Sequence, residues 1–231
     1  MPYFLSSRNS ESQELMDNPN CDQITLYNTY KQFRKINTLI AQWKRVYRKE
    51  LRPYLQTKPQ GHILDIGFGG GDIPLKLAKW AGEDQLNIHI TAIDTDERAL
   101  NYVHQLQVPD NITFIQCSPS DLIKNGNQYD FVISNHLLHH IPSEKLHNIL
   151  SKARQLSRYG VLFNDIRRSD IGYMLFNMFA RPFFQNSYIV QDGLTSIKRS
   201  YTYEELRDVI PPGWKVNKLF PYRLLLNYYH E

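Results

Sequence analysis

Cysteine is scarce in this sequence, and long apolar runs are missing. Cys21 and Cys117 are the only cysteines among 231 residues, which excludes a disulfide framework and a cysteine-based zinc pattern. No apolar run approaches the length of a membrane span. The N-terminal stretch lacks the basic segment and apolar core of a secretory signal. We therefore expect a cytoplasmic protein without stable membrane insertion.

Concentrated charge is also missing. The formal net charge is +4, and lysine and arginine are spread along the chain rather than gathered in a stripe or tail. Nucleic-acid-binding proteins usually show such a cluster, so we expect no nucleic-acid partner. With 42% hydrophobic and 22% charged residues, the composition is that of an ordinary globular protein, long enough for one core with a small lid.

Helical and strand-like stretches alternate through the middle of the chain. Apolar residues recur every three or four positions over 22–56, which predicts a helix. The alternation that follows predicts an α/β fold with a seven-stranded, mostly parallel sheet, helices on both faces and an antiparallel C-terminal hairpin. The expected strands are 62–66, 88–94, 112–117, 129–135, 160–165, 214–220 and 222–229, and the further helices are 72–81, 96–107, 143–157 and 202–210.

The sequence divides into an N-terminal helical segment, 1–57, and a main domain, 58–231. Residues 1–13 are polar, and we expect them to be frayed. An insertion at about 166–200 contains the Met- and Phe-rich stretch "IGYMLFNMFARPFF". Such a stripe is usually core, but here it follows the carboxyl end of a parallel strand, where open α/β sheets bind ligands. The roles of a lid and of core packing both stay open.

A glycine-rich turn follows the first strand, in "HILDIGFGGGDIPLKLAKWA". A triphosphate-binding P-loop needs a Lys where Asp72 stands, and a carboxylate there repels phosphate. A dinucleotide turn needs its third glycine at the same place. Asp65 ends the strand, and three glycines follow at alternate positions (Gly67, Gly69 and Gly71). This pattern suits a cationic or zwitterionic ligand with an amino group and a sulfonium.

The pattern resembles the glycine motif of class I S-adenosylmethionine-dependent methyltransferases. The resemblance covers about residues 60–165 and includes "YDFVISNHLLHHI", which looks like the post-strand motif of the small-molecule branch, quinone-biosynthesis methyltransferases included. It implies a Rossmann-like fold and S-adenosylmethionine as the cofactor. Asp65 would orient the methionine amino group, and Asp94 would bind both ribose hydroxyls. The implied cofactor-binding residues are Asp65, Gly67, Phe68, Gly69, Gly71, Asp94, Thr95, Ser118 and Asn135.

Two of these assignments have alternatives. Asp94 could cap the following helix, but Asp96 is the better N-cap, which leaves Asp94 free for ribose. After the third strand the family often has an acid and a small residue beside adenine, whereas this sequence reads "CSPSDL". Either Ser118 and Ser120 make these contacts, or Asp121 reaches in.

Three histidines just beyond the fourth strand are the catalytic candidates. A phenol has a pKa of about 10, so a neutral imidazole near the transferred methyl group would help to remove its proton. We rank them His136, His140, His139, because His136 is closest to the strand end. A structural role, such as capping the next element, stays open for each. We see no Asp/Glu/His cluster at metal-ligand spacing and expect no metal.

Residues after the fifth strand are candidates for acceptor binding. Arg167 and Arg168 in "NDIRRSD" could bind a carboxylate or enolate, or pair with nearby acids at the surface, which we prefer for Arg168. Tyr173, Phe176 and Phe179 in the insertion indicate an apolar or aromatic acceptor.

We therefore expect a methyltransferase that acts on O or C of a small, largely apolar compound such as a phenol, quinol or polyketide-like ring, as a monomer or homodimer. An RNA or protein methyltransferase is one alternative, but "SNHLLHH" is not the Asn/Asp-Pro-Pro-Tyr-like motif typical of that class. A non-catalytic methyltransferase-like partner subunit is the other. The intact Asp65, glycines and Asp94 argue against it.

Overall fold

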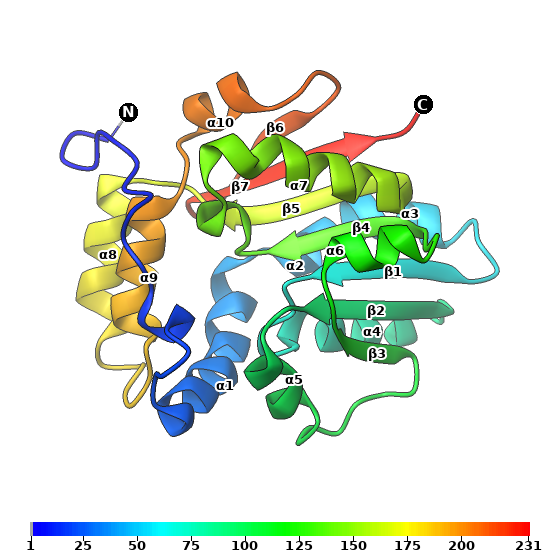
Figure 1. Ribbon diagram of the computed structural model, residues 1–231, viewed down its shortest axis with the longest axis horizontal. Helices are drawn as coiled ribbons and strands as arrows, with labels where there is room; N and C mark the ends of the chain where they lie inside the picture. Colours follow the sequence, from blue (N-terminus) through cyan, green and yellow to red (C-terminus); the bar gives the residue numbers. More distant parts are fainter. Residues whose placement is uncertain (1) are drawn as a thin grey trace.

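Seven strands form one sheet in the order β3-β2-β1-β4-β5-β7-β6 in the computed structural model, which describes residues 2–231 (Figure 1). The first five strands pair in parallel, and β7 runs antiparallel to β5 and β6. The Rossmann-like sheet predicted from the sequence is confirmed. The strands are β1 (Gly61–Ile66), β2 (Ile88–Asp94), β3 (Ile112–Gln116), β4 (Tyr129–Asn135), β5 (Ser157–Ile166), β6 (Lys215–Leu219) and β7 (Arg223–Tyr229).

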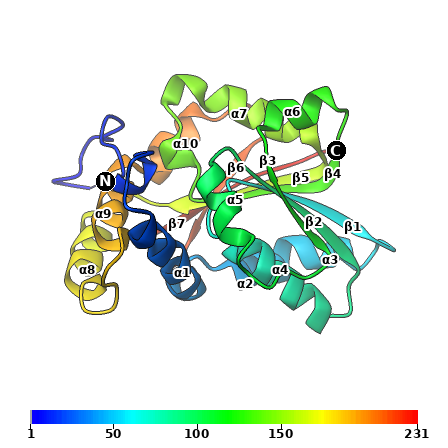
Figure 2. The ribbon, with the colours of Figure 1, turned by 60° about the horizontal axis from the view of Figure 1, so that its bottom comes forward.

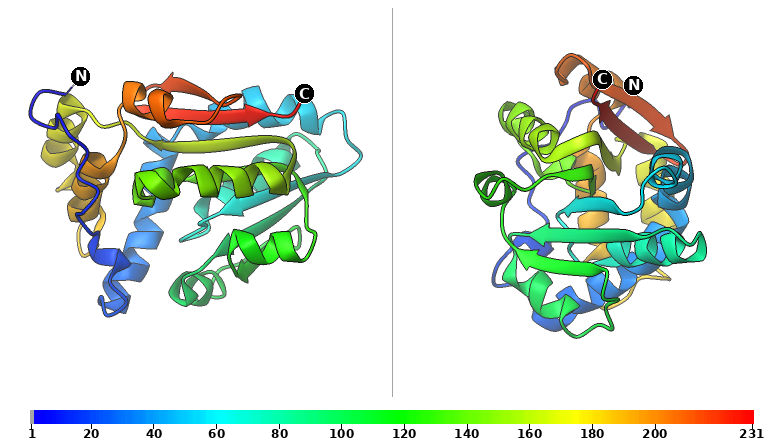
Figure 3. Two further views of the ribbon diagram at one scale, coloured as in Figure 1. Left: turned by 45° about the horizontal axis from the view of Figure 1, so that its top comes forward. Right: turned by 90° about the vertical axis from the view of Figure 1, so that its right-hand side faces the viewer.

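Helices cover both faces of the sheet, as the right-hand view of Figure 3 shows. The α-helices are α1 (Gln23–Ile40), α2 (Trp43–Val46), α3 (Arg52–Leu55), α4 (Asp72–Glu83), α5 (Glu97–Val103), α6 (Pro119–Lys124), α7 (Ser143–Leu156), α8 (Asp170–Ala180), α9 (Ile189–Arg199) and α10 (Tyr203–Val209). Shorter helical turns are η1 (Leu15–Asp17), the π-helical η2 (Tyr47–Leu51) and η3 (Leu138–His140). No helix within residues 2–231 has the length and apolar character needed to cross a membrane.

The core has two main layers, one on each face of the sheet. Because successive side chains of a strand point to opposite faces, Ile63 packs with α2, α3 and α4, whereas its neighbour Leu64 packs with α6, α7 and α10. Phe131 and Val132 on β4 divide in the same way. The apolar runs of β1 and β4 therefore mark strands that are buried on both sides.

The helix predicted over 22–56 is interrupted. α1 ends at Ile40, and Gln42 adopts a left-handed conformation with φ 56° before α2 begins. The side-chain amide of Asn164 donates to the carbonyl oxygen of Ala41 at 2.5 Å, and the indole Nε1 of Trp43 donates to Asn135 at 2.9 Å. These contacts with β4 and β5 hold the chain in a break that helical periodicity alone does not predict.

The N-terminal stretch is packed rather than frayed, so that expectation is wrong. It runs beside α9, and the backbone N–H of Asn9 donates to the carbonyl oxygen of Lys198 (Figure 1). Arg8 donates to the carbonyl oxygens of His139 and Ile141, just after β4. The first residues thus connect the end of α9 to the loop that follows β4.

The insertion at 166–200 forms α8 and α9. Together with α1 and the N-terminal stretch, these helices gather beyond the carboxyl ends of the parallel strands (Figure 2, and the left-hand view of Figure 3). Open α/β sheets bind their ligands at this edge.

Candidate active site

A cavity of about 920 Å³ lies between the carboxyl ends of the parallel strands and the helices α1, α8 and α9. Small-molecule sites usually measure about 300–1,000 Å³. One end is lined by the glycine turn and by acids at the ends of β1 and β2, and the other by aromatic residues of α8. The cavity thus joins the predicted cofactor turn to the predicted insertion.

The glycine turn presents open space to this cavity. Gly67 and Gly69 have φ values of 79° and 49°, which glycine adopts without strain. A Cβ at either residue would meet one atom within 4 Å, at 3.8 Å. Gly71 differs, since its Cβ would lie 2.9 Å from the Phe114 ring and it does not line the cavity. Of the predicted turn residues, Gly67, Phe68 and Gly69 line the cavity, and Gly71 leaves room for Phe114 of β3 and Val103 of α5.

Asp65 is a buried carboxylate that lacks a partner. It lines the cavity and is 2% exposed, and its Oδ1 accepts no hydrogen bond from residues 2–231. Burial raises the pKa of Asp65 well above its usual range, and the nearby Asp72 and Asp94 raise it further. A cationic group in the cavity would relieve both the missing hydrogen bond and the repulsion between the acids.

Asp94 is held at the end of β2 by backbone donors. Its Oδ2 accepts from Gly69 N at 2.9 Å and its Oδ1 from Asp96 N at 3.0 Å. Asp96 caps α5 by accepting from Arg98 N, as predicted. Asp94 is therefore not the cap of α5, as expected, and although it already accepts two backbone hydrogen bonds, each of its oxygens can accept a further one. Burial raises the pKa of Asp94, and Thr95 lies beside it in the cavity wall.

Ser118, Ser120 and Asp121 do not line the cavity. Ser118 is the N-cap of α6 and forms a capping box with Asp121, whose Oδ2 accepts from Ser118 N at 3.0 Å and from Ser118 Oγ at 2.7 Å. The geometry therefore brings neither predicted alternative for adenine contact to the cavity.

Arg223, which sequence reasoning did not single out, organises the polar floor beyond β4. Its Nη2 donates to Asn135 Oδ1 at 2.8 Å, and its Nη1 lies 3.1 Å from His136 Nε2. His136 Nε2 also lies 3.1 Å from Asn37 Oδ1. Burial and the charge of Arg223 lower the pKa of His136 well below its usual range. His136 is thus neutral, but its Nε2 already faces Arg223.

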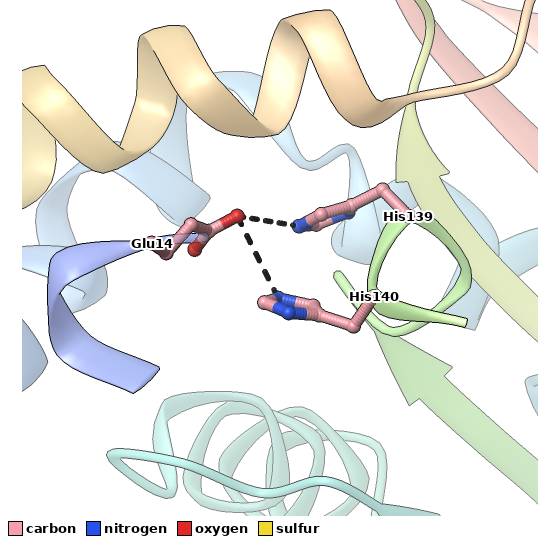
Figure 4. Close-up of side chains that lie close together, drawn as sticks. All are labelled: Glu14, His139 and His140. Atoms are coloured by element: carbon pink, nitrogen blue, oxygen red, sulfur yellow. Dashed lines mark ion pairs between the residues drawn. The ribbon is translucent and has the colours of Figure 1, made fainter. Parts of the chain in front are cut away.

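His139 and His140 converge on Glu14, as Figure 4 shows. His139 Nε2 lies 3.3 Å from Glu14 Oε1, and its Nδ1 lies 2.7 Å from Asp165 Oδ1. Burial alone would lower the pKa of His139, but the carboxylates of Asp165 and Glu14 raise it to about 9. His140 Nε2 lies 3.8 Å from Glu14 Oε1, and its Nδ1 lies 3.3 Å from Asp17 Oδ2.

Sequence reasoning missed Glu14 completely. Asp192 on α9 accepts from the backbone N–H groups of Leu15 and Met16, and Ser196 Oγ donates to Glu14 Oε1 at 2.8 Å. Nothing in the polar N-terminal pattern signals these contacts, since they depend on how α9 folds back. The expectation that no cluster has metal-ligand spacing is also wrong, because ligand atoms of Glu14, His139 and His140 all lie within 4.8 Å of one another.

Of the predicted acceptor-binding residues in the insertion, some line the cavity and one does not. Phe176, Phe179 and Arg167 line the cavity, and the Arg167 guanidinium lies 5.5 Å from the centre of the Tyr222 ring. Tyr173 does not line it and instead packs edge-on against Phe4.

Arg168 contradicts its predicted surface role. Its side chain is fully buried, and it donates at 2.8 Å to the carbonyl oxygens of Leu5 and Ser200 and pairs with Glu205. A buried guanidinium needs several acceptors, and the N-terminal stretch supplies part of them. The sequence does not show these pairings, because the acceptors lie in two segments at least 32 residues from Arg168, one at the N-terminus and one at Ser200 and Glu205.

Known proteins match the part of the chain that carries the glycine turn, its acids and the histidines after β4. A family model described as a methyltransferase domain matches residues 63–160. The ubiquinone/menaquinone biosynthesis C-methyltransferase UbiE of Rickettsia felis is 27% identical over 167 residues, or 70% of this chain. The match spans 64% of that relative's length. The corresponding protein of Rickettsia prowazekii is 36% identical over 74 residues, which cover 30% of each chain.

A solved structure shows the same fold. The plantazolicin methyltransferase BpumL in complex with SAH is similar with a TM-score of 0.60 at 17% sequence identity, over 92% of this chain and 90% of that chain. The family match, the relatives and the shared fold agree with the glycine turn and with the acids that line it. The chain thus carries a methyltransferase domain over residues 63–160 and is similar in sequence and fold to S-adenosylmethionine-dependent methyltransferases.

Proposed function

We propose that this chain transfers a methyl group from S-adenosylmethionine to O or C of a small, largely apolar or aromatic acceptor. The observation that carries the proposal is the cavity, which runs from the partnerless carboxylate of Asp65 to the aromatic side chains of α8. A phenol, quinol or polyketide-like compound fits such a lining. A cytoplasmic location and a monomeric or homodimeric state are part of the same proposal.

The residues of the glycine turn fit the cofactor. When bound, S-adenosylmethionine supplies an electrophilic methyl group on a sulfonium. Asp65 would accept from its amino group, because the Oδ1 atom lacks any other partner. Asp94 would accept from ribose hydroxyls with its remaining lone pairs, and the open faces of Gly67 and Gly69 would allow close approach. An acidic environment also favours a ligand with net positive charge.

The rest of the cavity would hold the acceptor. Phe176 and Phe179 offer apolar contact, and burial beneath α8 and α9 would exclude water from the reaction. The protein contributes mainly alignment in this chemistry, since the leaving group is activated within the cofactor. His140 is the proposed acceptor of the nucleophile's proton, because it lines the cavity and its side chain is 28% exposed, whereas His136 Nε2 faces Arg223.

Calorimetric titration tests the cofactor. S-adenosylmethionine and its demethylated product should both bind, and NAD should not, because Asp72 stands at the start of α4 where a pyrophosphate would need a positive or neutral site. Tight binding of NAD with no response to either sulfur nucleoside would overturn the proposal.

Turnover with a panel of acceptors tests the substrate class. Labelled methyl groups should appear on phenols, quinols or polyketide-like compounds and not on RNA or protein. The mainly apolar lining supports a small apolar acceptor over a macromolecule. Methylation of RNA or protein alone would support the enzyme alternative. Cofactor binding without turnover on any acceptor would support a non-catalytic partner subunit.

A further inference from the structure

Two neighbouring histidines aim the same kind of nitrogen at one carboxylate oxygen. His139 Nε2 and His140 Nε2 lie 3.3 Å and 3.8 Å from Glu14 Oε1 (Figure 4). All three residues line the cavity, on the side of α9. The proposed methyl transfer requires only one base, so it does not explain why two histidines and a carboxylate converge at this point.

The spacing matches a transition-metal site. Zinc holds imidazole nitrogen and carboxylate oxygen at about 2.0–2.2 Å in tetrahedral geometry, so that two ligand atoms stand about 3.3–3.6 Å apart. The separations of His139 Nε2 and His140 Nε2 from Glu14 Oε1 fall within or close to this range. Two histidines with one carboxylate form a donor set that leaves the fourth position open.

Each histidine also has a carboxylate behind it. His139 Nδ1 lies 2.7 Å from Asp165 Oδ1, and His140 Nδ1 lies 3.3 Å from Asp17 Oδ2. Histidine ligands of metals almost always donate the other ring N–H to such a partner, which fixes the tautomer and turns the free nitrogen towards the ion. Both rings therefore have the orientation that a shared ion requires.

One ligand atom of this cluster is buried without a hydrogen bond. His139 is 1% exposed, and its Nε2 has no hydrogen-bond partner among the described residues, although it lies 3.3 Å from Glu14 Oε1. Buried polar atoms seldom stay unpaired. Among the cations nearby, Arg199 on α9 lies closest to the ligand carboxylate, with its Nη1 3.9 Å from Glu14 Oε1 and 3.5 Å from Asp17 Oδ2, whereas Arg8 and Arg223 act on Asp165.

A second group at ligand spacing, His136 with His139 and Asp165, is the weaker candidate. His139 already directs Nδ1 to Asp165, and His136 Nε2 lies 3.1 Å from the guanidinium of Arg223. A cation at that point would be repelled by the arginine. The Glu14 cluster has no guanidinium at hydrogen-bond distance from either Nε2 atom.

We propose that Glu14, His139 and His140 bind a divalent transition-metal ion of the zinc class, with its open coordination position facing the cavity. Binding of the ion is independent of the methyl transfer proposed above. The ion's role rests on that function: with His140 as a ligand, the ion would take over from its ring by stabilising the deprotonated acceptor oxygen, whose proton passes to solvent and which the open position would hold beside the transferred methyl group.

Zinc titration of untagged, metal-stripped protein, in competition with a chromophoric chelator, tests the site directly. One ion should bind per chain. Cobalt should give the visible absorption of a four-coordinate site. Glu14→Gln and His140→Ala should each weaken zinc binding at least tenfold. The exposed Glu11→Gln and His104→Ala, which remove the same groups elsewhere, should leave it unchanged.

The outcomes test the metal site separately from the proposed methyltransferase activity. Absence of stoichiometric zinc binding, or binding that both site variants retain in full, overturns the proposal. Circular dichroism checks the fold of each variant, and His140→Ala is informative even if Glu14→Gln unfolds, because His140 is partly exposed. Titration with S-adenosylmethionine in metal-free protein reports on the cofactor site alone, so either proposal can fail without the other.

Discussion

Asp65 is a proposed cofactor ligand, and its burial lowers the stability of the ligand-free protein. Burial raises its pKa, so the folded chain holds a proton there that the unfolded chain loses above about pH 4. The unfolded state then binds fewer protons than the folded state, and this contribution lowers stability as the pH rises from about 4 through the raised pKa of Asp65. The positively charged amino group of the cofactor would offset this loss of stability by pairing with the ionised Asp65.

Asp65→Asn should therefore stabilise the ligand-free protein near pH 7 and weaken cofactor binding. Thermal denaturation across a pH series should show the variant melting higher than the wild type at neutral pH, with the difference shrinking towards pH 4. Calorimetry should show the loss of affinity for S-adenosylmethionine. A variant that melts lower than the wild type at pH 7 would mean that the carboxylate stabilises the empty fold.

Asp94→Ala should weaken cofactor binding by about 2–3 kcal/mol, because charge-assisted hydrogen bonds to the ribose hydroxyls are lost. The fold should survive, although Gly69 N and Asp96 N lose their acceptor. Calorimetric dissociation constants measure the effect, and Asp110→Ala, which removes an exposed acid before β3, is the matched control. An unchanged dissociation constant in folded Asp94→Ala would exclude Asp94 from the site.

At the scale of elements, the sequence pattern predicted those helices and strands that depend on interactions between residues close together in the chain. The parallel strands and α4, α7 and α10 follow from apolar periodicity, and the glycine turn from its strand-helix junction. α6 was missed because a single capped helix of six residues has little periodicity to read. The break after α1 and the packing of the N-terminal stretch depend on Asn164 and Arg8, whose partners lie far away in the sequence.

The insertion helix α8 allows a test of the lid. Phe179 is 56% exposed and lines the cavity, whereas its neighbour Met178 is 62% exposed and does not. Phe179→Ala should raise the acceptor's KM or lower turnover, because apolar contact with the acceptor is lost, and should leave cofactor affinity nearly unchanged. Phe176→Ala should act in the same direction but also destabilise, since its ring packs closely on Gly193 of α9.

Steady-state kinetics and melting temperatures of the variants are both measured in this test. Met178→Ala is the control on the same helix and should change neither KM nor the melting temperature appreciably. If Phe179→Ala lowers the melting temperature with no selective effect on the acceptor, the Met- and Phe-rich stripe serves packing alone.

At the scale of the whole molecule, the candidate site depends on segments that meet only in the folded chain. Glu14 comes from the N-terminal stretch, the histidines from the loop after β4, and the supporting Asp192 and Ser196 from α9. No sequence pattern links these segments. The cofactor end of the cavity, by contrast, is built from consecutive residues and could be predicted.

Arg8 connects the same three segments from outside the cavity. Its guanidinium donates to the carbonyl oxygens of Arg199, His139 and Ile141 and, at 2.7 Å, to the hydroxyl of Tyr201. It also lies 4.0 Å from the centre of the Tyr201 ring. One partly buried side chain thus fixes the position from which the N-terminal stretch leads to Glu14.

Arg8→Ala should lower the free energy of unfolding by about 2–3 kcal/mol, because several charge-assisted hydrogen bonds are lost and their carbonyl partners become unpaired. Urea denaturation measures the loss, and Arg45→Ala, which removes an exposed arginine of α2, should change it little. Limited proteolysis should then cut the N-terminal stretch faster, while affinity for S-adenosylmethionine at the distant glycine turn should hold. Equal protection of the N-terminal stretch in both variants would show that Arg8 does not hold it in place.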